Sequence, residues 1–189
     1  MRLDPGIAIG EGAGVYRPSD DSYLLMAGIA VAPGERFLEV GTGTGLIALH
    51  AARLTSAVAT DADPRAAALA AANARRNELG LDVVRCDLMA AVRGPFDVVA
   101  FNPPYLEGRA TDEEGRAWHG GEAGSEVAMR FLRDLPRVLA PGGRAYLLLS
   151  RANGPAWEFA ESRFEARVVL SKALFFERLD VLELREPTE

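Results

Sequence analysis

The chain of 189 residues has little of what a disulfide-bonded, metal-binding or membrane-spanning protein needs. Its single cysteine, Cys86, excludes an intrachain disulfide, and its two separated histidines, His50 and His119, provide no cluster of metal ligands. No uninterrupted apolar run reaches the roughly 20 residues that span a bilayer, and the amino terminus lacks the layout of a secretory signal. These absences predict a soluble, cytoplasmic protein without a metal site.

Basic residues are also scarce relative to acidic ones, 21 against 27, which gives a formal net charge of −6. Because phosphate neutralisation needs clustered Lys and Arg, this balance argues against a protein that coats nucleic acid, although a local basic groove is compatible with it. The hydrophobic fraction of 49% is enough for one substantial core. We therefore expect a single domain over residues 15–189, preceded by a flexible, glycine-rich segment over residues 1–14.

Apolar runs that predict strands alternate with segments that predict helices through the first hundred residues or so. Ser19 and the two acids after it suit the start of the first helix, and Asp63 followed by Pro64 suits the start of a later one. The expected strands are residues 36–40, 57–60, 82–86 and 96–101, and the expected helices are residues 19–31, 46–54 and 63–78. This alternation is typical of a parallel sheet built from βαβ units.

Expected strands and helices continue to alternate through the second half of the chain, almost to its end. The expected elements are a helix over residues 125–139, a strand over residues 145–149 and a short helix over residues 156–162. Pro141-Gly142-Gly143 should separate the first two. The last two expected strands, residues 166–170 and 179–184, are too close in sequence for a helical crossover and should form an antiparallel pair at the sheet edge. The sequence thus predicts an α/β fold in three layers, with a doubly wound, Rossmann-like, mostly parallel sheet.

Four residues, Asn102-Pro103-Pro104-Tyr105, directly follow the strand over residues 96–101. Two consecutive prolines cannot continue a strand or a helix, so the motif places an amide side chain at the carboxyl end of a buried strand. Open α/β sheets bind their ligands at this end. On its own the motif favours a Pro-Pro turn whose asparagine hydrogen-bonds its own backbone, so its neighbours decide between the two interpretations.

A glycine turn, Gly41-Thr42-Gly43-Thr44-Gly45, joins the first strand to the next helix and allows the backbone to approach a ligand closely. Leu46 stands where the dinucleotide-binding pattern G-x-G-x-x-G requires its third glycine. Glu39, just before the turn, suits a positively charged ligand better than a pyrophosphate. S-adenosylmethionine, which carries an ammonium and a sulfonium group, is such a ligand.

Two further acids follow the next two strands. Asp61 stands about twenty residues after the turn, where a carboxylate can accept both ribose hydroxyls of a nucleoside. Asp87 could accept from the amino group of adenine, with Leu88 against the base. Each acid alone is more simply a solvated loop carboxylate or a helix cap. Together with Glu39, at three strand ends beside a glycine turn, they predict a cofactor site.

The strand-end acids, the glycine turn and Asn102-Pro103-Pro104-Tyr105 together resemble class I S-adenosylmethionine-dependent methyltransferases that act on exocyclic or amide nitrogens. Two more segments narrow the resemblance: Val15-Tyr16-Arg17-Pro18-Ser19-Asp20-Asp21-Ser22 and Ala117-Trp118-His119-Gly120-Gly121-Glu122-Ala123-Gly124. Both are similar to segments of the HemK-type glutamine methyltransferases, in the compact branch that archaea and eukaryotes use on class 1 release factors. The resemblance covers residues 15–184 and implies the class I methyltransferase fold.

The resemblance also implies roles for individual residues. The cofactor contacts would come from Ser22, Glu39, Gly41, Gly43, Asp61, Asp87, Leu88 and Asn102. Asn102, Pro103, Pro104 and Tyr105 would be catalytic and hold the target nitrogen, because the Asn102 side-chain oxygen and the Pro103 carbonyl can accept the two hydrogens of an amide. Trp118 would close over the substrate, although an aromatic side chain that fills the sheet edge explains it equally well.

The implied substrate is the glutamine of the Gly-Gly-Gln loop of a peptide-chain release factor. Because an exocyclic amine fits the same acceptors, an RNA or DNA methyltransferase acting on adenine or guanine is one alternative, and a methyltransferase-like subunit that only binds cofactor is another. Relatives in this branch often need a small zinc-binding activator protein. Here it would pair with the edge strand that runs from Asp82 to Cys86. No membrane partner is expected.

Overall fold

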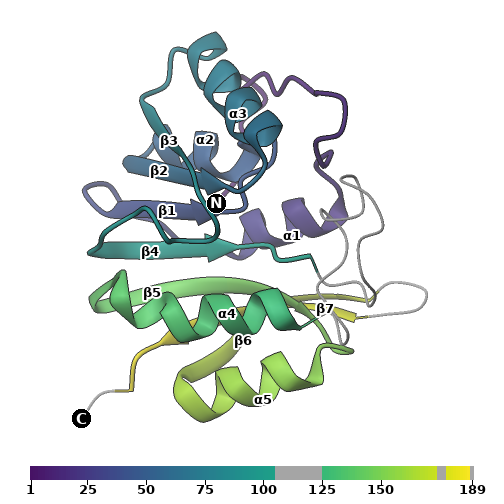
Figure 1. Ribbon diagram of the computed structural model, residues 1–189, viewed down its shortest axis with the longest axis vertical. Coiled ribbons are helices and arrows are strands. Elements are labelled where there is room, and N and C mark those ends of the chain that lie inside the picture. Colours follow the sequence, from purple (N-terminus) through teal and green to yellow (C-terminus); the bar gives the residue numbers. More distant parts are fainter. Residues whose placement is uncertain (105–124, 174–177, 188–189) are drawn as a thin grey trace.

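The computed structural model describes residues 1–104, 125–173 and 178–187. Within these ranges seven strands form one sheet, in the order β3-β2-β1-β4-β5-β7-β6 (Figure 1). The strands are β1 (Arg36–Val40), β2 (Ser56–Asp61), β3 (Leu81–Arg85), β4 (Phe96–Phe101), β5 (Leu139–Ser150), β6 (Glu165–Ala173) and β7 (Arg178–Arg185). β1 to β5 are parallel, and β7 is antiparallel to both of its neighbours. This confirms the predicted sheet and its antiparallel carboxy-terminal pair.

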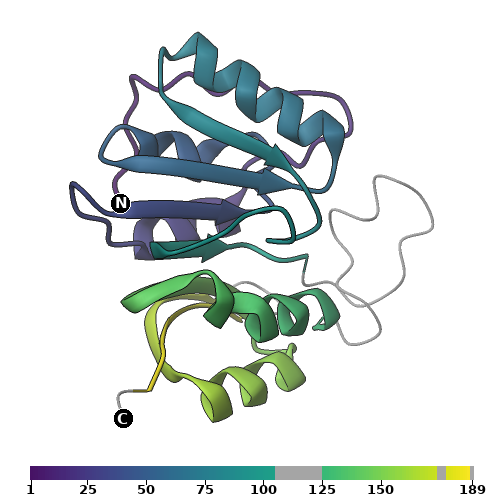
Figure 2. The ribbon, with the colours of Figure 1, turned by 60° about the vertical axis from the view of Figure 1, so that its left-hand side comes forward.

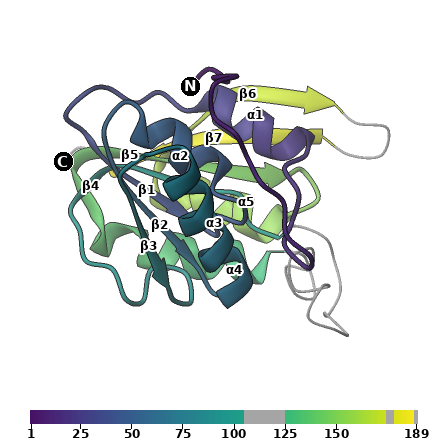
Figure 3. The same ribbon diagram turned by 90° about the horizontal axis from the view of Figure 1, so that it is seen from above.

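Helices cover both faces of the sheet and complete three layers (Figure 2). One face carries α1 (Asp20–Gly28), α2 (Leu46–Ala52) and α3 (Pro64–Arg76), and the other carries α4 (Glu126–Asp134) and α5 (Gly154–Arg163). Alternate strand residues serve the two faces: Phe37 packs in the core beneath α1 and α2, and Leu38 packs in the core beneath α4. Figure 3 shows α1 lying beside β6 and β7. No helix in the described part of the chain is long and apolar enough to cross a membrane.

Strands β1 and β4 have the predicted bounds, whereas four helices, α1 to α4, end earlier than predicted, α1 and α4 by the most. α1 ends at Gly28 rather than near residue 31. Gly28 lies against β7, where a β-carbon would come within 2.9 Å of Val181 Cγ1. α4 ends at Asp134, and Leu135–Arg137 forms a 3-10 turn, because Pro136 has no N–H to continue the α-helix.

β5 begins at Leu139, well before the predicted strand over residues 145–149. Leu139 pairs with Phe96, and the regular register resumes at Arg144 opposite Val98, so the residues between form an irregularity within the strand. An irregularity of this kind keeps the chain in the sheet. Sequence patterns instead treat Pro-Gly-Gly as a break, which is why the prediction placed the strand too late.

The amino-terminal segment, residues 1–14, has no regular secondary structure and lies against α2 and α3. Ile7 is buried there, in a small apolar cluster with side chains of both helices. A β-carbon on Gly10 would come within 2.8 Å of Asn73 Oδ1 of α3. The glycines therefore have a packing role that the prediction of a flexible lead-in did not include. The flexibility of the segment itself stays a prediction.

Candidate functional site

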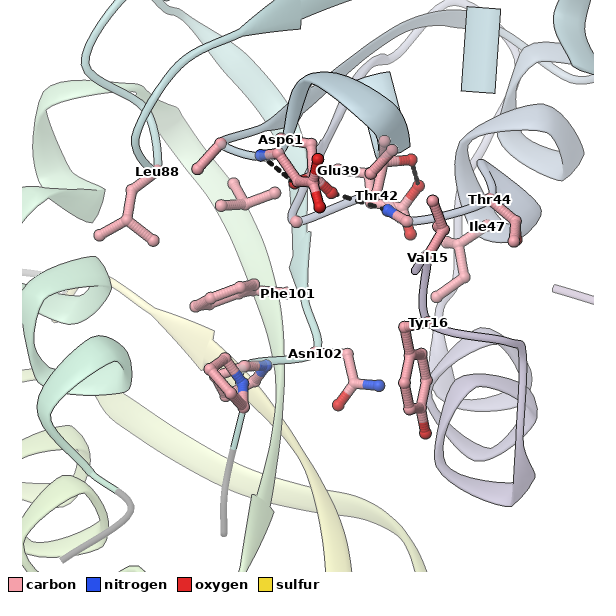
Figure 4. A pocket seen from close by; sticks show the side chains of 18 of the residues that line it. Val15, Tyr16, Glu39, Thr42, Thr44, Ile47, Asp61, Leu88, Phe101 and Asn102 are labelled. Carbon is pink, nitrogen blue, oxygen red and sulfur yellow. Dashed lines mark hydrogen bonds between the residues drawn. The ribbon is translucent and has the colours of Figure 1, made fainter. Parts of the chain in front are cut away.

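A cavity of about 590 Å³ opens at the carboxyl ends of β1, β2 and β4 (Figure 4). This is the sheet edge at which doubly wound folds bind their ligands. The cavity lining includes every described residue that the sequence predicted for the site: Ser22, Glu39, Gly41, Gly43, Asp61, Asp87, Leu88, Asn102, Pro103 and Pro104. Tyr105 and Trp118 lie outside the described residues. The fold thus brings the predicted cofactor and acceptor residues into one cavity.

The glycine turn, residues 41–45, is held in place by the protein itself. All three of its glycines have positive φ, between 55° and 86°, which other residues adopt only with strain. Three side chains from different elements hold it: Glu39 accepts from Thr42 Oγ1 (2.5 Å), Asp61 accepts from Gly43 N (2.9 Å) and Asn73 donates to Thr44 O (2.9 Å). The turn therefore has its shape before a ligand binds.

Glu39, the last residue but one of β1, is a buried acid with an exposed fraction of only 5%. Burial raises the pKa of Glu39 to about 8, and the hydrogen bonds from Thr42 Oγ1 and Ala48 N only partly offset this. Asp61 nearby raises the pKa further. A cation in the cavity would favour the ionised carboxylate, so the site is suited to a ligand with an ammonium group.

Asp61, at the end of β2, is fixed by two backbone amides. Its Oδ2 accepts from Gly43 N and its Oδ1 from Asp63 N, both at 2.9 Å. Burial raises the pKa of Asp61, against the effect of these hydrogen bonds. Because two carboxylate oxygens have about four acceptor positions, room remains for the hydroxyls of a ribose. As predicted, Asp63 caps α3 by accepting from Arg65 N.

Asp87 lies at the rim of the cavity, with 60% of its side chain exposed, and pairs with Arg130 of α4 at 2.5 Å. Leu88, next to it, has a φ of 47° that is unusual for a leucine. The hydroxyl of Thr60 donates to the Leu88 carbonyl at 2.8 Å and supports this conformation. Both residues are where the sequence placed them, but Arg130 is an addition that the sequence did not indicate. Their contact with adenine stays a prediction.

Asn102, just after β4, has its side-chain amide held on one side only. Its Nδ2 donates to Asp21 Oδ2 of α1 at 3.1 Å, and the same carboxylate oxygen accepts from the hydroxyl of Tyr16 at 2.7 Å. Its Oδ1 is buried and has no hydrogen-bond partner among the described residues. Figure 4 shows Asn102 beside Tyr16, on the side of the cavity away from Glu39. The site thus contains a fixed, unused hydrogen-bond acceptor.

Asp21 and Tyr16 line the cavity beside Asn102, a place that the sequence does not predict for them. The sequence assigns Asp21 to a helix start and includes both residues in the segment that carries the family resemblance, without a role at the site. One signal was available. Asp21 stands three and four positions before Leu24 and Leu25, which places all three on the same helix face. In the structure all three are buried. An acid on a buried helix face is a candidate for a partner across the fold.

A metal is not indicated by the described residues, which contain no group of three or more His, Cys, Asp or Glu side chains placed to hold one. The cavity instead offers the carboxyl groups of Glu39 and Asp61, the glycine turn and the side-chain amide of Asn102.

Comparison with known proteins agrees with this chemistry. Residues 13–175 match the family model "Methyltransferase small domain". A putative protein N5-glutamine methyltransferase from Methanocaldococcus jannaschii is 37% identical over 149 residues, which cover 74% of each chain. The methyltransferase HEMK2 of Mus musculus is 34% identical over 166 residues, 78% of each chain.

A solved structure adds a match of the whole fold. The E. cuniculi Mtq2-Trm112 complex, described as responsible for the methylation of the eRF1 translation termination factor, contains a chain that superposes with a TM-score of 0.74 at 27% identity. The match covers 92% of this chain and 99% of that one. The HemK-type resemblance predicted from the sequence is confirmed. The chain belongs to the methyltransferase small domain family.

Proposed function

We propose that this chain transfers a methyl group from S-adenosylmethionine to the side-chain amide nitrogen of the glutamine in the Gly-Gly-Gln loop of a peptide-chain release factor. The observation that carries the proposal is the buried Oδ1 of Asn102, for which the described part of the chain provides no hydrogen-bond donor. A buried acceptor without a donor costs about 1 to 3 kcal/mol, and an N–H from a substrate would remove that cost. The activities for which the relatives are named support a glutamine as the source of that N–H.

An amide nitrogen is a poor nucleophile, because its lone pair is delocalised into the carbonyl group. Catalysis therefore depends on positioning. Asn102 Oδ1 and the Pro103 carbonyl can accept the two amide hydrogens, which fixes the nitrogen and draws electron density towards it. As positive charge develops on the nitrogen, these two acceptors bind its hydrogens more strongly.

Asp21 determines which atom of Asn102 faces the cavity. An ionised carboxylate can only accept hydrogen bonds, so the side of Asn102 that faces Asp21 must be its NH₂ group. The oxygen then points away from Asp21 and stays available to the substrate. Tyr16 Oη and the backbone N–H of Ser22 (2.6 Å) donate to the same carboxylate and hold it in place. Asp21 is therefore a positioning residue for the transfer.

The other side of the cavity fits S-adenosylmethionine. Glu39 would bind its ammonium group and Asp61 its ribose hydroxyls, while Asp87 and Leu88 would contact the adenine. Ser22, which also lines the cavity, would contact the cofactor from α1. When bound, the cofactor supplies an electrophilic methyl group on a sulfonium. The buried, high-pKa Glu39 is the observation that favours a cationic ligand there.

The partner in this proposal is a small zinc-binding activator protein at the exposed edge of β3. Among the strands that the structure describes, β3 is last in the sheet order and pairs with β2 alone, so its other side offers backbone groups for strand addition. Val83 and Val84 are only partly buried, and a strand added beside β3 would bury them further. Insolubility of the chain that co-expression with such a protein relieves supports this partner. A well-behaved chain that is fully active alone contradicts it.

One assay tests the proposed function against its alternative. Purified enzyme and tritiated S-adenosylmethionine are incubated in parallel with release factor, ribosomal RNA and DNA. We expect label on the release factor. Because translation ends in the cytoplasm, we propose that the enzyme acts there. An exocyclic amine of adenine or guanine fits the same two acceptors, so label on RNA or DNA alone would replace the proposal by a nucleic-acid methyltransferase. A chain that binds cofactor but labels none of the three would be a subunit without activity of its own.

A further inference from the structure

Asn73, in the second half of α3, is fully buried and connects two parts of the molecule that are far apart in sequence. Its Oδ1 accepts from Gly10 N at 2.9 Å, and its Nδ2 donates to Gly10 O at 3.0 Å. The same Nδ2 donates to Thr44 O of the glycine turn at 2.9 Å. One side chain therefore holds the amino-terminal segment and the turn together.

Asn77, four residues further along, makes the same pair of hydrogen bonds to the amino-terminal segment but does not reach the glycine turn. Its Oδ1 accepts from Ala8 N at 2.7 Å, and its Nδ2 donates to Ala8 O at 2.8 Å. Its second donor contact goes to Asn73 O at 2.7 Å, within the helix. Both asparagines seat the amino-terminal segment on α3, and of the two only Asn73 reaches the glycine turn.

We infer that Asn73 is a positioning residue for the cofactor, and that the amino-terminal segment fixes the shape of the cofactor cavity through it. Thr44 follows Gly43, whose N–H is bonded to Asp61, so a shift of Thr44 would disturb the contact that orients Asp61. The inference rests on the proposed cofactor, S-adenosylmethionine.

The amino-terminal segment also continues directly into the cavity wall. Gly14, Val15 and Tyr16 line the cavity, and Tyr16 donates to Asp21, which holds Asn102. A segment that is well seated at Gly10 therefore enters the cavity at a defined place. The glycine at position 10 suits this, because its backbone lies too close to the side chains of Asn73 and Arg76 to leave room for a side chain of its own.

The test compares Asn73→Asp with Asn77→Asp, which make the same chemical change one helical turn apart. Each replaces an NH₂ donor by a carboxylate oxygen that faces carbonyl groups, so both should lower the melting temperature. We expect S-adenosylmethionine, measured by calorimetry, to bind Asn73→Asp about tenfold more weakly than wild type and Asn77→Asp within about twofold of wild type. Equal affinities of the two variants would overturn the inference and make Asn73 purely structural.

A second pair gives the answer if Asn73→Asp does not fold. Gly10→Ala places a methyl group against the Asn73 amide and the Arg76 guanidinium without changing the chemistry of either, and Gly80→Ala, in open space, is its control. Weaker cofactor binding in Gly10→Ala alone supports the inference, and unchanged binding in both contradicts it. If wild-type protein itself does not bind S-adenosylmethionine, the proposed function fails first, and the two failures are thereby distinguished.

Discussion

The two halves of the cavity differ in how completely their hydrogen bonds are satisfied. The cofactor half is the glycine turn with Glu39 and Asp61, where side chains from β1, β2 and α3 already hold the backbone. The acceptor half is Asn102 with Asp21 and Tyr16, where residues 1–104, 125–173 and 178–187 offer no donor to the buried Oδ1 of Asn102. Under the proposed function, one half is complete before the cofactor binds, and the other becomes complete only when a substrate donates to Asn102 Oδ1.

This difference predicts that the two halves control different quantities. Contacts in a preformed half act on substrate and transition state alike and set cofactor affinity. An acceptor that strengthens its bond as charge develops acts on the transition state and sets the rate. Substitutions in the two halves should therefore separate cofactor Kd from kcat.

The largest effect is expected from Asn102→Ala. It removes the unused acceptor, and we expect kcat to fall by about a hundredfold to a thousandfold, as for the loss of one preorganised hydrogen-bonding group. Cofactor Kd, measured by calorimetry on the same protein, should stay within about threefold of wild type. A parallel loss of cofactor binding would mean that Asn102 supports the fold or contacts the cofactor itself, and would erase the distinction between the two halves.

Glu39→Gln should instead raise the cofactor Kd and leave kcat at saturating cofactor largely unchanged. Loss of the buried carboxylate should weaken S-adenosylmethionine binding by about ten- to a hundredfold, because its ammonium then lacks a charged partner. Saturating cofactor should restore much of the rate. A fall in kcat that excess cofactor does not relieve would contradict the assignment of Glu39 to the cofactor half.

Glu39→Gln should also change how the stability of the protein depends on pH. Because the folded-state pKa of Glu39 is raised to about 8, the fold disfavours the ionised form, and the stability of the cofactor-free protein should fall as pH rises from the ordinary carboxyl range to about 8. Glu39→Gln has no such loss. Its melting temperature should exceed that of wild type at about pH 8, and the advantage should shrink towards about pH 5. An advantage that does not change with pH would rule out this cause.

Asp21→Asn should have an intermediate effect within the acceptor half. An asparagine at position 21 can offer either an acceptor or a donor, so Asn102 is no longer forced to direct its oxygen at the substrate. We expect kcat to fall about tenfold with cofactor Kd unchanged, and Tyr16→Phe, which removes one donor to Asp21, to have a smaller effect of about threefold. Variants that lose stability but keep kcat would show that Asp21 serves only the fold.

The smallest effect is expected at the rim, from Arg130→Ala. The Arg130–Asp87 pair is more than half exposed on both sides, and pairs of this kind contribute about 0 to 1 kcal/mol. Release of Asp87 for the adenine amino group should tighten cofactor binding, by less than about fivefold. Weaker binding in Arg130→Ala would mean that the arginine itself contacts the cofactor.

The sequence predicts the placement of Glu39, the glycine turn and Asp61, because the signals for them are local, but not Asn73, which contacts Thr44 from 29 positions away. A strand, a glycine turn and an acid at the strand end stand side by side in the chain, and parallel strands bring successive ends together. Glu39 and Asp61 needed no information about distant contacts. The strands before them have bounds at or within one residue of those predicted, for the same reason.

The acceptor half could be predicted only in part, because its support comes from far away in sequence. Asn102 was found from its prolines, but its partner Asp21 stands 81 positions earlier. The packing of Gly10 could not be predicted for the same reason. A β-carbon at this position would meet Asn73, 63 positions later, whereas the sequence indicates only a glycine-rich segment whose flexibility stays a prediction. Close approach of this kind has no local signature in the sequence.

The central claim is that the free oxygen of Asn102 receives the amide of a glutamine. Its most direct test is mass spectrometry of a release factor after incubation with wild-type enzyme and S-adenosylmethionine, beside a release factor whose Gly-Gly-Gln glutamine is replaced by glutamate. We predict one added methyl group on that glutamine and none on the variant, which has no amide N–H to offer. Equal methylation of both proteins, or methylation at a different residue, would contradict the claim.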